Sequence, residues 1–266
     1  MIVFTTTRGK LWQVAASSGR LACVNLPDPA EYAVADAATI PTPALLIYTE
    51  RVDGNIRAVV ARCGGDPARW RPHVKTAKAG NVMARYLVHG ITRFKCATTK
   101  ELRVLLDLGA PDVLLSFPVV GATAERVRSL ATAHPATRMS VLIESTEHLD
   151  AFAGSGLGVF IDCNPGMDRT GIDPADAGAM ATLVHRVADA KCEFRGLHWY
   201  DGHLHGLDLA ERTAIAHRGY AALGNLVARL AALGVVPREI IVAGTPAAPC
   251  ALSYPSWRDI GTDIQI

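Results

Sequence analysis

The sequence predicts a (β/α)8 barrel, because short apolar runs alternate with longer amphipathic segments from residue 44 to residue 243. Apolar runs without polar alternation, each followed by a helix, are typical of strands in a parallel sheet covered on both faces. Eight such runs in about 200 residues fit a closed barrel. An open doubly wound sheet is the alternative, but no G-x-G-x-x-G motif follows the first run, which disfavours a dinucleotide-binding sheet.

Each expected strand is a short run rich in aliphatic and β-branched residues. The first, at 44–48, follows a Pro-Thr-Pro segment. The second, at 71–76, contains Pro72, which pushes Arg71 into an extended conformation. The other six expected strands lie at 94–97, 113–117, 139–143, 159–162, 194–200 and 240–243.

Amphipathic helices are expected between these strands. The first has Val52, Ile56 and Val59 on one face and ends at Gly64, since glycine commonly terminates a helix. The other expected helices run over about 79–89, through 102–109, 127–131 and 149–152, and over about 174–190 and 209–233.

Composition bounds the class of protein. Of 266 residues, 50% are hydrophobic, enough for a large core, and 27 basic against 25 acidic residues give a net charge too small for a polyanion-binding surface. No apolar run is long enough to span a bilayer. The six cysteines contain no C-x-x-C pair and are widely spread, which indicates a reducing compartment and a cytoplasmic protein. We therefore expect neither nucleic acid nor membrane as a partner.

The N-terminal segment differs from the rest of the chain. Residues 1–27 contain basic but no acidic side chains, a composition that weakly resembles a transit peptide. We expect residues 1–40 to form a poorly ordered or loosely packed extension, and residues 41–255 to form the barrel.

A lysine, Lys75, lies at the end of the second expected strand, within the run RPHVKTAK at 71–78. Active sites of such barrels form at the carboxyl ends of the strands. A partly desolvated lysine there, close to other cations, can act as an amine nucleophile. The alternative is a solvated basic loop, and spacing alone does not separate the two.

The sixth expected strand ends in Asp162 and leads into a glycine-bounded turn, at 162–171, that carries Arg169. An arginine on such a turn is suited to clamp an anionic group. An ordinary turn with a structural ion pair is the alternative reading.

A polar cluster at 196–205 ends the seventh expected strand and contains Tyr200, His203 and His205. The two histidines could share a metal ion, but no further ligands lie nearby in the sequence. General acid–base work or hydrogen bonding to a ring substituent is therefore favoured for Tyr200 and His203.

The eighth expected strand is followed by Gly244, Thr245 and Pro246. Small residues that open into a helix form an anion site, and barrels often bind phosphate after strands seven and eight. A nucleophilic lysine that faces a phosphate loop is the arrangement needed to hold a phosphorylated aldehyde, which indicates pyridoxal phosphate.

With these motifs in this order, the chain resembles the D-threonine aldolase and D-serine dehydratase family, a branch of the alanine-racemase-like, fold-type III pyridoxal phosphate enzymes. The run 71–78 resembles its lysine motif, 162–171 its Asp-Gly-Arg-Gly turn, 196–203 its Gly-Tyr-Gly-His strand and 244–246 its phosphate loop. The resemblance extends from about residue 41 to the end of the chain. It implies a barrel of the alanine racemase N-terminal domain type.

The resemblance also implies roles for individual residues. Lys75 would bind the cofactor aldehyde covalently and act as the base at the substrate Cα. Arg169 would neutralise either the phenolic oxygen of the cofactor or the substrate carboxylate. The other expected contacts to cofactor and substrate come from His73, Tyr200, His203, Gly244 and Thr245.

The implied reaction is a lyase reaction on D-3-hydroxy amino acids, a retro-aldol cleavage to glycine and an aldehyde. A D-serine dehydratase, an amino-acid racemase and a catalytically impaired or purely carrier barrel remain as alternatives. The implied partners are a small D-amino acid substrate and a second copy of the chain in a homodimer.

Members of this family continue into a second, β-rich domain, which holds a divalent metal ion with one histidine and a cysteine or aspartate. We expect residues 256–266 to be the beginning of that domain, and the metal ligands to be missing from this chain. Our hypothesis is that the sequence is a fragment. A chain of this length alone is expected to bind the cofactor with impaired aldolase activity.

Overall fold

The structure, a computed structural model, describes residues 4–5, 11–12 and 32–266. The chain divides into two compact units, Met1–Arg51 and Val52–Ile266. The loosely packed extension expected over residues 1–40 falls mostly outside the described residues.

The first unit contains little regular structure among its described residues. β1 (Phe4–Thr5) pairs antiparallel with β2 (Leu11–Trp12), and a single 3-10 turn, η2, spans Ala37–Thr39. Nearer the boundary, the Tyr48 hydroxyl donates to the carbonyl of Tyr32 at 2.8 Å, and the two rings meet edge to face.

The second unit is built on a parallel sheet of seven strands in chain order, from β3 to β9. Each strand pairs with the next along the chain, which is the pattern that a repeated strand–helix unit produces. The strands are β3 (Arg93–Cys96), β4 (Asp112–Leu115), β5 (Arg138–Ile143), β6 (Gly158–Cys163), β7 (Glu193–Trp199), β8 (Glu239–Val242) and β9 (Asp263–Gln265).

An eighth, extended segment at 69–74 joins the two edges of this sheet. On one side the Arg71 amide donates to the carbonyl of Ile266 at 2.8 Å, next to β9. On the other side the Val74 amide donates to Lys95 of β3 at 2.9 Å. Hydrogen bonds therefore run around the whole ring, and the predicted barrel is confirmed.

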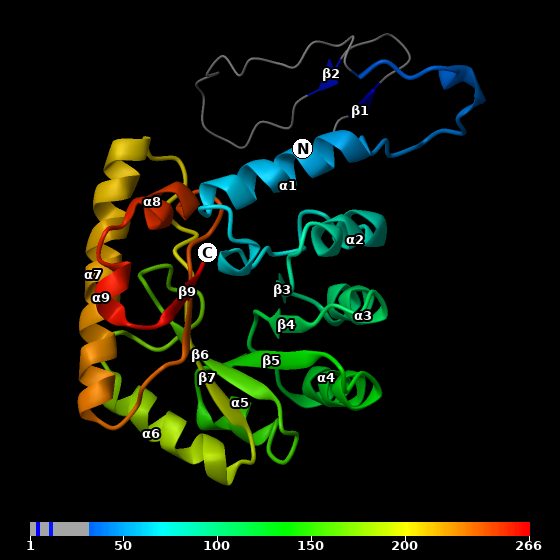
Figure 1. Cartoon of the computed structure of the whole chain (residues 1–266). Helices are drawn as coiled ribbons and strands as arrows, with labels where there is room; N and C mark the ends of the chain where they lie inside the picture. Colours follow the sequence, from blue (N-terminus) through cyan, green and yellow to red (C-terminus); the bar gives the residue numbers. More distant parts are fainter. Residues whose placement is uncertain (1–3, 6–10, 13–31) are drawn as a thin grey trace. The chain divides into compact units, whose positions relative to one another are not determined.

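The helices lie outside the sheet, and Figure 1 shows α2, α3 and α4 side by side along β3, β4 and β5. Several begin with a side-chain cap, as where Thr98 accepts from the amide of Glu101 at the start of α3. The helices are α1 (Thr49–Arg62), α2 (Gly80–Val88), α3 (Thr99–Asp107), α4 (Gly121–Ala133), α5 (Thr146–Asp150), α6 (Ala177–Asp189), α7 (Leu209–Ala232), α8 (Ala248–Ser253) and α9 (Trp257–Ile260), with the 3-10 turn η3 at Pro67–Arg69.

The strand expected at 44–48 is wrong. These residues form no strand, and the side chain of Leu45 is 63% exposed. An apolar run becomes a strand only where a neighbouring strand offers backbone partners. Because this run was counted as the first barrel strand, the segment that carries the lysine motif was numbered second. In the structure it is the first.

The last barrel strand is β9, which the sequence analysis did not predict. Residues 256–266, which we expected to begin a second domain, contribute β9 to the barrel sheet, where Ile264 pairs with Ile240 of β8. The run is only three residues long and includes Asp263 and Gln265, so it lacks the apolar pattern that identifies the other strands.

Alternation along the strands separates two apolar clusters. Outward side chains such as Val113, Leu115 and Val141 belong to a large core between the sheet and the helices. The inward side chains form a second, small cluster that fills the middle of the barrel: Leu114, Leu142, Phe160 and Ile241. A parallel barrel has such an interior because side chains point alternately to its two faces.

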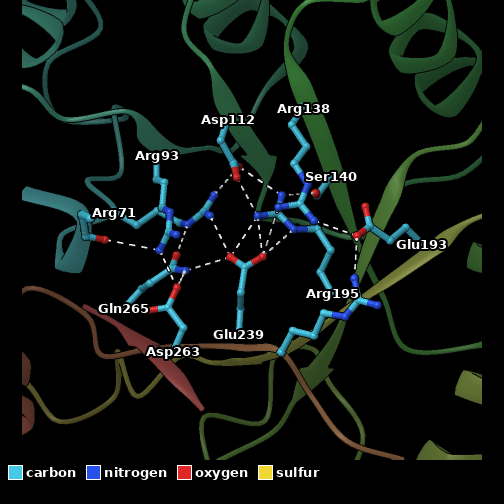
Figure 2. Close-up of polar contacts among 12 residues, drawn as sticks. Arg71, Arg93, Asp112, Arg138, Ser140, Glu193, Arg195, Glu239, Asp263 and Gln265 are labelled. Carbon is cyan, nitrogen blue, oxygen red and sulfur yellow. Dashed lines mark hydrogen bonds and ion pairs between the residues drawn. The ribbon is translucent and has the colours of Figure 1, made fainter.

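A buried charged group closes the amino-terminal end of the barrel (Figure 2). Two fully buried arginines, Arg71 and Arg195, share two carboxylates. Arg71 lies 2.8 Å from Asp112 and 3.3 Å from Glu239. Arg195 lies 2.6 Å from Asp112 and 2.7 Å from Glu239. We call the set the floor cluster, which comprises Arg71, Asp112, Ser140, Arg195, Glu239 and Gln265.

Every charge of the floor cluster has a partner from another strand. Both guanidinium groups also lie against the Phe160 ring of the apolar layer, with Cζ 6.0 Å from the centroid for Arg71 and 5.0 Å for Arg195. Gly158 makes room for Arg195, because a Cβ there would lie 2.6 Å from Arg195 Cδ. The floor therefore depends on a small residue as well as on paired charges.

Among the described residues, no helix is long and apolar enough to cross a membrane. The described cysteines are free thiols: Cys63, Cys96, Cys163, Cys192 and Cys250. The sixth, Cys23, lies outside the described residues.

Replacing Arg195 by methionine is expected to lower the free energy of unfolding by about 3–5 kcal/mol, because two buried carboxylates each lose one of their two buried arginine partners. The matched control is Arg238→Met, which removes an arginine with a 74% exposed side chain, 3.4 Å from Glu193. That change is expected to cost about 1 kcal/mol or less. Urea unfolding measures the free energy of unfolding of both variants. Equal decreases would show that the buried ion pairs of the floor cluster stabilise the fold no more than an exposed pair does.

Candidate active site

The lysine motif turns sharply where the first barrel strand ends. His73 makes the last bridge to Lys95, and the amides of Ala77 and Lys78 then donate back to the Val74 carbonyl at 3.0 and 2.9 Å. The turn leaves Lys75 exposed at the carboxyl end of the barrel. The sequence expectation of a lysine at the barrel mouth agrees with this geometry.

His73 supports this turn from below. The amide of Lys75 donates to His73 Nδ1 at 3.1 Å. Burial lowers the pKa of His73 to about 3, and the positive charges of Lys95 and Lys75 contribute in the same direction. The imidazole is therefore neutral at physiological pH, and its Nδ1 keeps the lone pair that the Lys75 amide needs.

Tyr200 brings two of the predicted cations together. Lys75 Nζ lies 5.4 Å from the centroid of the Tyr200 ring, and Arg169 Cζ lies 5.0 Å from it. Both distances fall within the range of cation–π attraction. Residues from three separate sequence motifs thus meet at one aromatic ring.

The turn that carries Arg169 is organised by its own side chains. Asn164 Oδ1 accepts from the amides of Gly166 and Asp168, each at 3.0 Å. Gly171 has a φ of +105°, and a Cβ there would lie 2.6 Å from the Asn164 amide nitrogen. The motif therefore needs a glycine at this position for a steric reason, and the turn projects Arg169 over the barrel mouth.

Phe117, which the sequence analysis gave no role, flanks the same arginine. It follows β4, is 42% exposed, and its ring centroid lies 5.7 Å from Arg169 Cζ. Phe117 thus gives Arg169 a second aromatic neighbour beside Tyr200, within the range of cation–π attraction. In the sequence, its position directly after a strand was the feature that could have placed Phe117 at the barrel mouth.

A buried histidine–aspartate pair lies inside the barrel below this ring. His198 Nδ1–H donates to Asp162 at 2.8 Å, and the His198 ring stacks on Tyr200 at 12° between the planes. Burial lowers the pKa of His198, against the opposing effect of Asp162. The pair holds Tyr200 in place and leaves His198 Nε2 as an acceptor.

Asp201 connects the two loops that follow β7 and β8. Its carboxylate accepts from the Gly244 amide at 2.8 Å and from the Tyr220 hydroxyl at 2.8 Å. Burial raises the pKa of Asp201, and these two donors oppose the rise. The Gly244 amide, which we expected to bind phosphate, is therefore already engaged, while Thr245 is exposed beside it.

Two glycines define the space around Tyr200. A Cβ on Gly202 would lie 2.3 Å from the ring, and one on Gly244 would lie 2.9 Å from it. Such approaches do not occur between real Cβ atoms and neighbouring atoms without movement. Both loops therefore pack their backbones directly against the ring.

His203 Nδ1 is buried and has no hydrogen-bond partner among the described residues. An unsatisfied buried nitrogen in a native fold requires an explanation such as a ligand. His205, by contrast, is exposed and contacts the Gly202 carbonyl at 3.2 Å. Within the described part of the chain, no group of three histidine, cysteine or acidic side chains could hold a metal ion.

Three residues at the barrel mouth have a left-handed backbone although they are not glycine. They are Lys78, with a φ of 52°, Asp168, with a φ of 54°, and Ala243, with a φ of 68°. Each lies in a different loop at the carboxyl ends of the strands. Strained residues persist where the surrounding structure fixes them, and they often cluster at functional sites.

The structure thus brings Lys75, His73, Arg169 and Tyr200 together, with Gly244 packed on the same ring. Lys95 joins them from β3 and has no role in the sequence expectations. The sequence could have indicated this position, because Phe94 and Cys96 flank the lysine in the run RFKC. Since side chains alternate along a strand, Lys95 points to the opposite face, inside the barrel.

Comparisons with known proteins agree with this geometry. The model of the family "Alanine racemase, N-terminal domain" matches residues 47–259. A D-threo-3-hydroxyaspartate dehydratase of Delftia sp. strain HT23 is 26% identical over 220 residues, which cover 80% of this chain and 57% of that protein. A D-threonine aldolase of Arthrobacter sp. is 24% identical over 228 residues, which cover 83% and 59%.

Among solved structures, a D-threonine aldolase from Filomicrobium marinum superposes with a TM-score of 0.75 at 26% identity. The match covers 86% of this chain and 62% of that one. The chain thus spans less than two thirds of the length of these relatives. The extent of the family match nevertheless shows that the chain belongs to the alanine racemase N-terminal domain family.

Proposed function

We propose that this barrel binds pyridoxal phosphate and acts as a lyase on D-3-hydroxy amino acids. The observation that carries the proposal is the placement of Lys75, whose amine lies over Tyr200 beside Arg169 at the carboxyl ends of the strands. Relatives named D-threonine aldolase and D-threo-3-hydroxyaspartate dehydratase support the substrate class. Retro-aldol cleavage of D-threonine to glycine and acetaldehyde is the reaction we favour.

The side chains at the barrel mouth fit an anionic aldehyde. Lys75 offers a primary amine at the rim, and Arg169 offers a permanent positive charge. His203 Nδ1 is a buried nitrogen that still lacks a partner among the described residues. An amine and a guanidinium over one aromatic ring, with an unpaired imidazole nitrogen on the loop that follows it, form a suitable set for a phosphorylated aldehyde cofactor.

Each residue has a defined task in this proposal. Lys75 would hold the cofactor aldehyde and move the proton at the substrate Cα. Tyr200 and His203 would line the ring and the substrate, and Arg169 would bind an anionic oxygen. When bound, pyridoxal phosphate supplies an electron sink for the bond that breaks.

The phosphate would lie at the loop after β8. Because the Gly244 amide is bound to Asp201, we assign Gly244 to shaping the loop and Thr245 to donating its amide and hydroxyl. A phosphate in this place agrees with the usual position in barrels, after strands seven and eight.

Three expectations remain predictions. These are a homodimer, a cytoplasmic location, and a divalent metal ion held by residues outside this chain. Without the metal ion, the same barrel would bind the cofactor but fail to cleave the bond between Cα and Cβ of the substrate. An assay for glycine and acetaldehyde distinguishes this cofactor-binding protein from an active lyase.

Lys75→Ala is expected to abolish the visible absorption of bound pyridoxal phosphate and to lower lyase activity by about 10³-fold or more, because it removes the amine that we assign to the cofactor aldehyde. The control is Lys100→Ala, an exposed lysine of α3, which is expected to leave both unchanged. The assay uses D-threonine with a divalent ion and measures glycine and acetaldehyde. Wild-type protein without an absorption change on cofactor addition would refute the proposal.

Two further assays test the alternative activities. Formation of pyruvate and ammonia from D-serine would indicate a dehydratase, and Cα deuterium exchange with racemic product would indicate a racemase.

A second prediction concerns acid. His73 titrates near pH 3 in the folded state and near pH 6.5 in the unfolded state, so the unfolded chain binds more protons between these values. The free energy of unfolding therefore falls as pH decreases below 6.5. From pH 7 to pH 5 the His73 contribution is about 2 kcal/mol. Urea unfolding of His73→Asn, which keeps an acceptor for Lys75, is expected to show a smaller decline than wild type, and identical declines would contradict the assignment.

A further inference from the structure

Lys95 is a second lysine inside the barrel, and the tasks assigned above do not use it. It lies on β3 between Phe94 and Cys96, whose side chains pack outward into the core between sheet and helices. Because side chains alternate along a strand, Lys95 points into the barrel. The residue is only 6% exposed.

The Lys95 ammonium has no hydrogen bond or ion pair with any residue that the structure describes. A buried charge normally pairs with an opposite charge, and leaving it unpaired is costly. The floor cluster below it shows the usual solution, since both of its arginines have carboxylate partners. Lys95 therefore fits a side chain whose partner is an acceptor atom of a ligand.

The surroundings of Lys95 favour an anionic partner. The groups that face it are Arg71 of the floor cluster, Lys75 at the rim, Asp201 after β7, and the two imidazoles of His73 and His198. The pKa of Lys95 is lowered to about 8, mainly by burial and also by the charges of Arg71 and Lys75, against the opposing effect of Asp201. The nearby carboxylates already accept other hydrogen bonds, Asp201 from the Gly244 amide and Tyr220 and Asp162 from His198. A ligand oxygen can therefore take the place of an acceptor for Lys95.

The order of strands indicates which oxygen this is. In pyridoxal phosphate the aldehyde-bearing ring carbon has the hydroxyl-bearing carbon on one side and the phosphate arm on the other. Around the barrel, the loop after β8 is followed by β9, by the segment 69–74 that leads into Lys75, and then by β3. With the aldehyde at Lys75 and the phosphate at the β8 loop, Lys95 lies on the side of the ring hydroxyl.

We propose, on the basis of the proposed function, that Lys95 Nζ donates a hydrogen bond to the phenolic oxygen of bound pyridoxal phosphate. This assignment decides between the two tasks left open for Arg169. Arg169 is exposed and lies over Phe117 and Tyr200 at the rim, where a substrate arrives from solvent. Lys95 thus serves the cofactor from inside the barrel, and Arg169 serves the substrate carboxylate.

The test compares Lys95→Met with Lys95→Arg in the full chain. Loss of one charge-assisted hydrogen bond is expected to weaken pyridoxal phosphate binding about 10–100-fold in Lys95→Met, measured by equilibrium titration. Lys95→Arg, which keeps the charge, is expected to stay within about threefold of wild type. A nearby positive charge lowers the pKa of the bound cofactor, so removing that charge raises it. The pH midpoint of the bound cofactor's absorption is therefore expected to rise by about one unit in Lys95→Met and to stay unchanged in Lys95→Arg.

Two controls separate this role from others. Without cofactor, Lys95→Met is expected to have an unfolding midpoint equal to or above that of wild type, because the ammonium lacks a partner in the described structure. Arg169→Met is expected to raise the KM for the D-amino acid while the cofactor's affinity and pH midpoint stay near wild type. If Lys95→Met binds the cofactor like wild type, with an unchanged pH midpoint, this inference is wrong and the proposed function stands. If wild-type protein binds no cofactor, both are wrong.

Discussion

The pairing of two buried guanidinium groups with two carboxylates at the amino-terminal end of the barrel underlies the rest of the structure. Arg71, Arg195, Asp112 and Glu239 come from four different barrel strands, and Gln265 adds a fifth. Buried charges tolerate little rearrangement, because any lost partner leaves an uncompensated charge. The cluster thereby fixes the relative positions of strands far apart in sequence, including the strand that carries the lysine motif.

The barrel interior has three levels with different tasks. Charge pairs close the floor (Figure 2), an apolar layer around Phe160 covers them, and polar side chains occupy the mouth, where we propose that the cofactor binds. Arg71 and Lys75 are four residues apart, so the buried end of the motif anchors the strand that presents the reactive amine. Rigid support for a chemical group is what precise positioning of a cofactor requires.

Much of this architecture could be predicted from sequence, since continuous apolar runs identified β4 to β8 and four motifs identified the mouth. The expected strands at 71–76 and 94–97 correspond to the first barrel segment and to β3, although the run at 44–48 shifted their count. The last strand, β9, could not be identified in this way. Residues 44–48 have the apolar pattern without sheet partners, whereas β9 has partners with only a short and partly polar run. Tertiary pairing, which a single sequence does not display, decides these cases.

In the mechanism that we propose, Lys75 is the amine that holds the cofactor, while Lys95 assists without reacting. Both lysines lie in one barrel and on neighbouring strands, so a direct chemical map can separate them. Reduction of the loaded protein with borohydride makes the bond to the cofactor permanent, and mass spectrometry of the digest locates it. The account predicts the added mass on the peptide that contains Lys75. Added mass at Lys95, or no labelled peptide, would contradict it.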